Sequence, residues 1–230
     1  MWYTFAFNKK EIEKYILSDH PSQMIEDKDL SDVFKPVLML KEVPQDTKAH
    51  PEHENVFVHI TRAMDDAAKI ADTEGLSEDD RLVLIFASLF HDMGKGKTTR
   101  IVLESGASIP YKAYKDSDGP IVKTTSEGHE TACLPEIKHI LKELEIKKNL
   151  RRKIVALVQY HMQPAHLSDE SKIPESRLVE IIKGLDKVGA GLNLLKYVHE
   201  ADVYRRRQLY EDGGMKILKR LNEVKDKYDL

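Results

Sequence analysis

Apolar side chains recur every three or four residues along most of this chain, and that period predicts helices with one buried face. After residue 53 the predicted helices cover 53–73, 78–92, 127–145, 148–162, 174–186, 190–210 and 213–228. Ser77 is a suitable N-cap for the second of these, with Asp80 three residues further on. Earlier in the chain, the pattern predicts a helix over 8–18 and a second stretch around 29–41.

Residues 98–127 lack this helical period. They contain β-branched residues, tyrosines, glycines, two prolines and the turn sequence "DSDG". The segment therefore predicts a small β-hairpin or a long loop inserted between helices. The expected fold class is all-α, a helical bundle with a small β-hairpin insertion around 98–127.

Composition excludes several classes of protein. Hydrophobic residues make up 41% of the 230 residues, which is enough for one sizeable core. A net charge of −3 argues against a general nucleic-acid coat. Cys133 is the single cysteine, which excludes an internal disulfide and a Cys-based zinc site. Without a signal-peptide pattern or an apolar run of about 18–20 residues, we expect a soluble cytoplasmic protein that does not contact a membrane.

Five of the predicted helices carry an imidazole or a carboxylate on the face that should be apolar. These residues are His59, the adjacent pair His91 and Asp92, His129, His161 and Asp202. His59, for example, falls within the stripe that contains Val56 and Ile60. One such histidine is more often a core residue with its hydrogen bonds satisfied. Several buried polar groups without partners would cost a few kcal/mol each, so a shared partner is the better explanation.

One or two divalent metal ions would supply that partner. Histidine and aspartate without thiolate suit Fe, Mn, Ni, Mg or Zn. Adjacent helical residues point about 100° apart, so His91 and Asp92 would serve neighbouring ions, and the two oxygens of Asp92 could bridge them. Lys95 follows at a position from which it could neutralise a bound phosphate, although charge compensation at a helix end is an equally good explanation.

The motifs "HPEHENVFVHITRAMDDAA", "FHDMGKG", "GHE" and "EADVYRRR" resemble the HD superfamily of metal-dependent phosphohydrolases. Over roughly residues 30–210, together with the connector "VPQD", they are similar to the HD domain attached to bacterial CCA-adding tRNA nucleotidyltransferases. The resemblance implies a helical HD fold over 51–230, with 1–50 as a helical lead-in packed on it. Because 1–50 is too short for a nucleotidyltransferase head, we do not expect CCA addition.

The resemblance also implies roles for the residues. His59, His91, Asp92 and Asp202 would be the core metal ligands, and His129 and His161 would hold a second ion. Asp92 and Lys95 would act in catalysis, while Lys95, Arg206 and Arg205 would bind the substrate phosphate. A solvated helix face is the alternative for the arginines. Cys133 and Arg205 both stand where the family commonly has glycine.

The expected activity is phosphodiesterase or phosphatase action on nucleotides or RNA ends such as 2′,3′-cyclic phosphates. The partner would be a phosphorylated small molecule, a nucleotide or an RNA end, and a homodimer is a candidate assembly. Two alternatives stay open. One is an HD-fold mixed-valent di-iron oxygenase, which uses the same six ligands. The other is a non-catalytic HD module that binds nucleotide or RNA.

Overall fold

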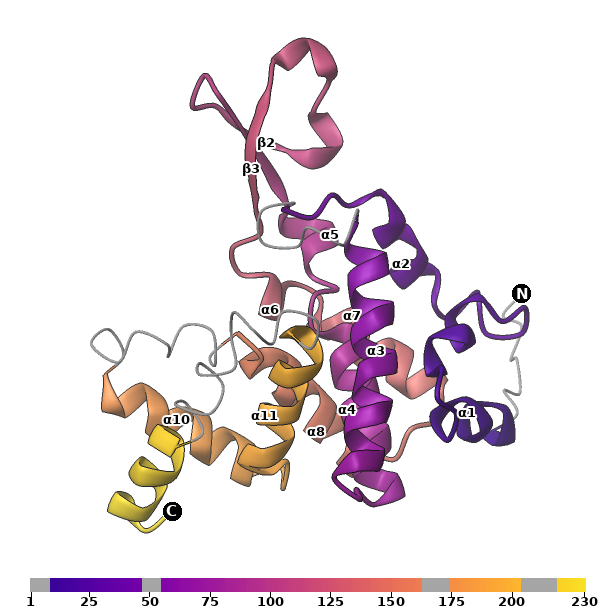
Figure 1. Cartoon of the computed structure of the whole chain (residues 1–230), viewed down its shortest axis with the longest axis vertical. Helices are drawn as coiled ribbons and strands as arrows, with labels where there is room; N and C mark the ends of the chain where they lie inside the picture. Colours follow the sequence, from indigo (N-terminus) through magenta and orange to yellow (C-terminus); the bar gives the residue numbers. More distant parts are fainter. Residues whose placement is uncertain (1–8, 47–54, 163–173, 204–218) are drawn as a thin grey trace.

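The computed structural model describes residues 9–46, 55–162, 174–203 and 219–230 and confirms the helical fold class. Four helices form its centre (Figure 1). They are α3 (Val56–Thr73), α4 (Glu78–Phe90), α8 (Lys148–Tyr160) and α11 (Gly191–Val203). Helix α4 packs against the other three, and α11 packs on α3. The helical period thus identified the elements that build the core.

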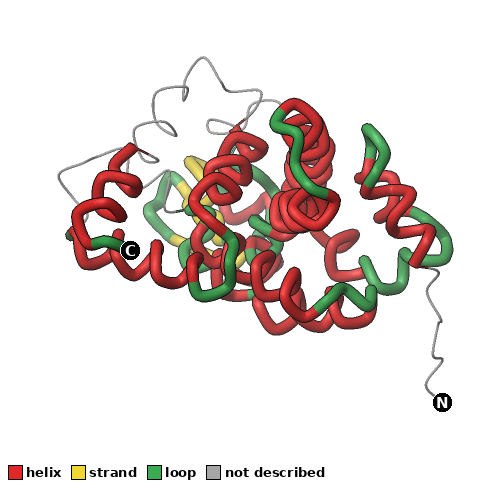
Figure 2. The backbone as a smooth tube through the Cα atoms, turned by 90° about the horizontal axis from the view of Figure 1, so that it is seen from below, coloured by secondary structure: helices red, strands yellow, loops and turns green. Residues whose placement is uncertain are grey.

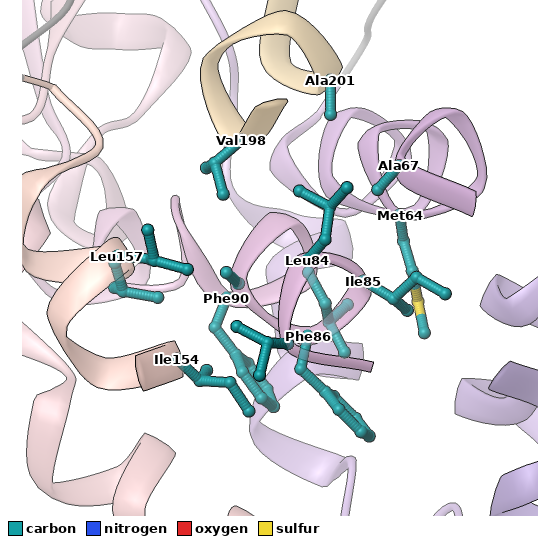
Figure 3. Close-up of a cluster of buried hydrophobic side chains, with 14 of the residues drawn as sticks. Met64, Ala67, Leu84, Ile85, Phe86, Phe90, Ile154, Leu157, Val198 and Ala201 are labelled. Carbon is teal, nitrogen blue, oxygen red and sulfur yellow. The ribbon is translucent and has the colours of Figure 1, made fainter. Parts of the chain in front are cut away.

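Apolar side chains from these four helices meet in one cluster (Figure 3). The labelled members include Met64 and Ala67 of α3, Leu84 and Phe86 of α4, Ile154 and Leu157 of α8, and Val198 and Ala201 of α11. Burial of apolar surface contributes about 25 cal/mol per Å², so this cluster holds the four helices in fixed positions. Four of the six predicted metal ligands lie within these helices or at their C-caps.

Capping residues define where two of the four central helices, α3 and α4, begin. The side chain of Asn55 accepts a hydrogen bond of 2.9 Å from the backbone N–H of Val58 at the start of α3. The predicted cap of α4 is confirmed, because Ser77 Oγ accepts from the N–H of Asp80 at 3.2 Å. Each cap satisfies a backbone donor that would otherwise lack a partner.

The helix predicted over 127–145 is divided in two. Helix α6 (His129–Ala132) ends before Cys133, and α7 (Leu134–Glu143) follows it. Pro135 lies in the first turn of α7. Its ring has no N–H and would clash with a preceding helical turn, so one continuous helix cannot form. The break leaves His129 as the first residue of a short helix.

The N-terminal segment is helical in short pieces. These are α1 (Lys9–Ile16), the 3-10 helix η1 (Pro21–Glu26), α2 (Lys35–Leu38) and the 3-10 helix η2 (Met39–Glu42). Arg81 of α4 ties this segment down, because its buried guanidinium donates to the carbonyls of Ile16 at 2.7 Å and Ser18 at 3.1 Å. The division of the chain into domains at residue 50 stays a prediction.

The β insertion predicted between helices is present, with one strand more than a hairpin. Strands β1 (Arg100–Leu103), β2 (Ser108–Pro110) and β3 (Ile121–Thr125) form an antiparallel sheet in the order β2-β1-β3. Two short 3-10 helices, η3 (Tyr111–Ala113) and η4 (Asp116–Asp118), lie between β2 and β3. The short helix α5 (Lys95–Thr98) leads into the sheet, which projects from one end of the helical body (Figure 1).

The C-terminal part adds α10 (Glu175–Asp186) and a helix over 219–228. Figure 2 shows the helical body from below, where 219–228 and α1 lie at opposite sides. Helix α11 and the helix over 219–228 confirm the predicted helices 190–210 and 213–228 in the part of each that the structure describes. Within the described residues, none of the helices has both the length and the apolar character needed to cross a membrane.

Candidate metal centre

All six predicted ligand residues converge on one place in the structure. The six side chains form two sets of three. Within each set, the potential ligand atoms lie within 4.8 Å of one another. Group 1 consists of His59, His91 and Asp202, and group 2 consists of Asp92, His129 and His161. The four histidines and Asp92 are buried, whereas the side chain of Asp202 is 20% exposed. The centre is therefore shielded from bulk water on most sides.

Helix ends bring most of these side chains together. His91 and His161 are the C-caps of α4 and α8, and His129 begins α6. His59 projects from the first half of α3 and Asp202 from the last turn of α11. Because Asp92 directly follows His91, the end of α4 supplies one residue to each group. This is how two adjacent residues can serve two neighbouring sites.

Backbone carbonyls fix the tautomer of three histidines. The Nδ1 atoms of His91, His129 and His161 each lie 2.7 Å from a carbonyl oxygen, which belongs to Ser88, Ser126 and Val158 respectively. A carbonyl oxygen only accepts hydrogen bonds, so Nδ1 must carry a hydrogen and donate it. In the neutral ring, Nε2 then presents a lone pair, which is the form that binds a metal ion.

The facing lone pairs in group 2 require a cation. His129 Nε2 lies 3.2 Å from His161 Nε2 and 3.0 Å from Asp92 Oδ1. Two neutral rings in these tautomers would repel each other, unless a proton or a metal ion lies between them. Burial, together with the charges of His91 and His129, lowers the pKa of His161 to about 3. His161 is therefore neutral and ready to act as a ligand at neutral pH.

Group 1 also concentrates negative charge around its imidazoles. His59 Nε2 lies 3.0 Å from His91 Nε2 and 3.0 Å from Asp202 Oδ1. Burial pulls the pKa of His91 down, but the charges of Asp92 and Asp202 outweigh it and raise the pKa to about 10. Burial also opposes ionisation of Asp202, yet hydrogen bonds from His59 and His91 hold its pKa well below the usual range. Group 1 therefore favours the binding of a positive charge, either a proton on His91 or a metal ion.

The carboxylate of Asp92 lies between the two groups. Its Oδ2 is 3.3 Å from His59 Nε2 and 3.4 Å from His91 Nε2, while its Oδ1 is 3.0 Å from His129 Nε2. Burial acts to raise its pKa, but the charges of Lys95 and His91 keep the pKa well below normal. An ionised carboxylate with one oxygen toward each group has the arrangement that a bridging ligand needs.

Two nearby lysines differ in their partners. Lys95 Nζ lies 2.6 Å from Asp92 Oδ2 and 3.1 Å from Gln45 Oε1, so it belongs to the centre. Lys97 instead pairs with Glu136 and donates to the carbonyl of Ala132. Gln45 was not predicted as a site residue. Gln45 belongs to the connector "VPQD". This connector has no helical period, so its sequence does not indicate that Gln45 lies beside Lys95.

The donor set fits a divalent ion of the predicted kind. Each group combines two imidazoles with one carboxylate, so both groups can hold a metal ion. The Cys133 thiol lies apart from them, 3.6 Å from the carbonyl oxygen of Met93. Arg205 and Arg206 lie outside the described residues, so their assignment to phosphate binding stays a prediction.

The HD domain family matches residues 56–191, and the chain belongs to this family. HD domains are typically metal-dependent phosphohydrolases. The match includes every residue of the two groups except Asp202, which follows it in the sequence and joins group 1 through the position of α11. A comparison with curated proteins gives no match.

Proposed function

We propose that this protein is a metal-dependent phosphodiesterase or phosphatase that acts on nucleotides or on RNA ends such as 2′,3′-cyclic phosphates. The observation that carries the proposal is the position of Asp92, whose two oxygens face two separate His/Asp groups beside Lys95. The substrate class follows from the resemblance of the motifs to the HD domain of CCA-adding tRNA nucleotidyltransferases.

In this proposal His59, His91 and Asp202 would hold one ion, His129 and His161 would hold a second, and Asp92 would serve as a ligand to both. Two such ions lower the pKa of a water molecule and act as Lewis acids toward phosphoryl oxygens. The Nδ1–H bonds to backbone carbonyls keep the imidazole rings of His91, His129 and His161 in their ligand orientation. Burial of the centre limits access of bulk water, which strengthens every electrostatic interaction within it.

Lys95 supplies a fixed positive charge in this proposal. Its side chain is 13% exposed, and Asp92 and Gln45 hold its ammonium group in place. Negative charge grows on the phosphoryl oxygens during hydrolysis, and a cation that is already oriented stabilises it without reorganisation. Lys97 has no such role, because its partner is Glu136, which belongs to neither His/Asp group.

Hydrolysis assays test this proposal. We would assay bis-p-nitrophenyl phosphate and 2′,3′-cyclic AMP with Mn, Ni, Co, Mg and Fe, using the wild-type protein and Asp92→Asn. Asp66→Asn is the matched control, since Asp66 is also buried but pairs with Lys69 in α3. Metal-dependent turnover that is lost in Asp92→Asn and kept in Asp66→Asn would support the proposal.

The same preparations separate the alternatives. Oxygen consumption by iron-loaded protein that hydrolyses neither substrate would indicate the di-iron oxygenase. Metal-loaded protein that neither hydrolyses nor consumes oxygen, yet binds nucleotide, would indicate the non-catalytic module. Light scattering of the purified protein tests the predicted homodimer.

A further inference from the structure

Gln45 is linked to the metal centre through a single side chain. Its Oε1 lies 3.1 Å from Lys95 Nζ, and Lys95 Nζ lies 2.6 Å from Asp92 Oδ2. The amide of Gln45 and the carboxylate of Asp92 therefore share one ammonium group. Neither of the two His/Asp groups includes Gln45.

Backbone pairing holds Gln45 in a fixed position. The preceding residue, Pro44, forms an antiparallel bridge with Asn55, and the N–H of Val56 donates to the carbonyl of Val43 at 2.9 Å. Asn55 is also the N-cap of α3, the helix that carries His59. The position of Gln45 is thus tied to the same helix as a residue of group 1.

The contact with Lys95 determines the orientation of the amide. A lysine ammonium group only donates hydrogen bonds, so the atom that faces it must be Oε1. Nε2, with two N–H donors, then points elsewhere. Gln45 is 5% exposed, and its Nε2 is buried without a hydrogen-bond partner among the described residues. A buried donor without an acceptor is costly, so this amide group is suited to donate to an oxygen that the described residues do not provide.

On the basis of the proposed phosphohydrolase activity, we propose that Gln45 binds the substrate by donating a hydrogen bond from Nε2 to a phosphoryl oxygen. Non-bridging phosphoryl oxygens are acceptors, and Lys95 places positive charge next to the amide. Gln45 and Lys95 would together orient the phosphoryl group beside Asp92. The ligand chemistry is that of a phosphate ester, with inorganic phosphate as the simplest probe.

Two substitutions separate this role from mere support of Lys95. Gln45→Glu keeps an oxygen acceptor for Lys95, but removes both N–H donors and adds a negative charge. Gln45→Met has a similar length and adds no charge, but it removes both the N–H donors and the oxygen acceptor for Lys95. Gln23→Glu is the matched control, because it makes the same chemical change at an exposed position in η1.

The experiment uses the full chain loaded with Mn²⁺. Calorimetric titrations give the Kd of Mn²⁺ and then the Kd of inorganic phosphate for the wild type and all three variants. We expect Gln45→Glu to weaken phosphate binding by about tenfold or more, and Gln45→Met to weaken it by a smaller factor. The Kd of Mn²⁺ should stay within about twofold of wild type, which also shows that the variants are folded. Gln23→Glu should match wild type in both titrations.

Steady-state kinetics provide a second readout. Loss of a phosphate contact made in the ground state should raise KM more than it lowers kcat. Wild-type affinity for phosphate in Gln45→Glu would overturn the role of Gln45 and leave the proposed function intact. If Gln45→Glu loses Mn²⁺ binding, Gln45→Met decides the question. Wild-type phosphate affinity in Gln45→Met would then overturn the role of Gln45. Wild-type protein that binds Mn²⁺ but neither binds phosphate nor hydrolyses an ester would overturn both proposals.

Discussion

Gly94 lies directly against the backbone of His129. A Cβ atom at Gly94 would overlap the carbonyl oxygen of His129 and come within 2.7 Å of its carbonyl carbon. Gly94 is the residue just before α5, and His129 begins α6, so this contact sets how closely the two short helices approach. The absence of a side chain at residue 94 thus helps to place an imidazole of group 2.

We expect Gly94→Ala to displace His129 and to lower the number of ions bound per chain from two toward one. The backbone has to shift to make room, which should also cost about 1–3 kcal/mol of stability. Elemental analysis and thermal unfolding measure the two effects. In the control Gly96→Ala, the new methyl group meets the end of a flexible side chain, Leu40 Cδ2 at 3.0 Å. Equal metal content in the two variants would contradict this prediction.

Lys95→Met should lower kcat by about 10²–10³-fold, the usual effect of removing one oriented group that stabilises transition-state charge. Lys97→Met is its control, because Lys97 pairs with Glu136 rather than Asp92. Its kcat should stay close to wild type. Kinetics with bis-p-nitrophenyl phosphate at saturating Mn²⁺ measure both. Similar losses in the two variants would show that Lys95 has no special part in the reaction.

The stability of the metal-free protein should fall as the pH rises from 7 toward 10. Burial lowers the pKa of His91, but Asp92 and Asp202 raise it to about 10, whereas its unfolded value is near 6.5. The stabilisation is therefore complete below about pH 6.5 and is lost as the pH approaches the folded pKa. The slope for one proton is at most about 1.4 kcal/mol per pH unit.

Urea unfolding of EDTA-treated protein at several pH values tests that slope. His91→Asn lacks the titrating group and should show a flatter profile between pH 7 and pH 10. Wild-type stability that stays constant or increases over this range would argue against a protonated His91 in the metal-free protein.

Asp202→Ala should remove the ion of group 1 and leave that of group 2. Asp202 Oδ1 lies 3.0 Å from His59 Nε2, and its loss leaves group 1 with two imidazoles and a share of Asp92. Metal titration of this variant should give about one ion per chain. Two ions bound with wild-type affinity would show that the residues within 56–191 are sufficient for both sites.

Periodicity identified the ligand candidates because helical geometry is local. His59 and His161 fall on apolar stripes, so a repeat of three or four residues is enough to mark them as buried. Periodicity does not predict which ligand candidates belong to the same group. That His129 meets His161, and that Asp202 meets His59, depends on how α6, α8, α3 and α11 pack in three dimensions.

Features without a regular period were harder to predict. Gln45 lies in a connector, and its place beside Lys95 depends on the pairing of Pro44 with Asn55. Strand β3 is separated from β1 and β2 by η3, η4 and the turn at Gly119, so two adjacent strands were easier to expect than three. The break before α7 had a local cause in Pro135, but the apolar pattern of 127–145 continues across it.

Anomalous diffraction from crystals of the Mn²⁺-loaded protein tests the central claim most directly. The account predicts two manganese peaks, one among His59, His91 and Asp202 and the other beside His129 and His161, with the carboxylate of Asp92 between them. A single peak, or manganese bound away from Asp92, would contradict the two-ion centre.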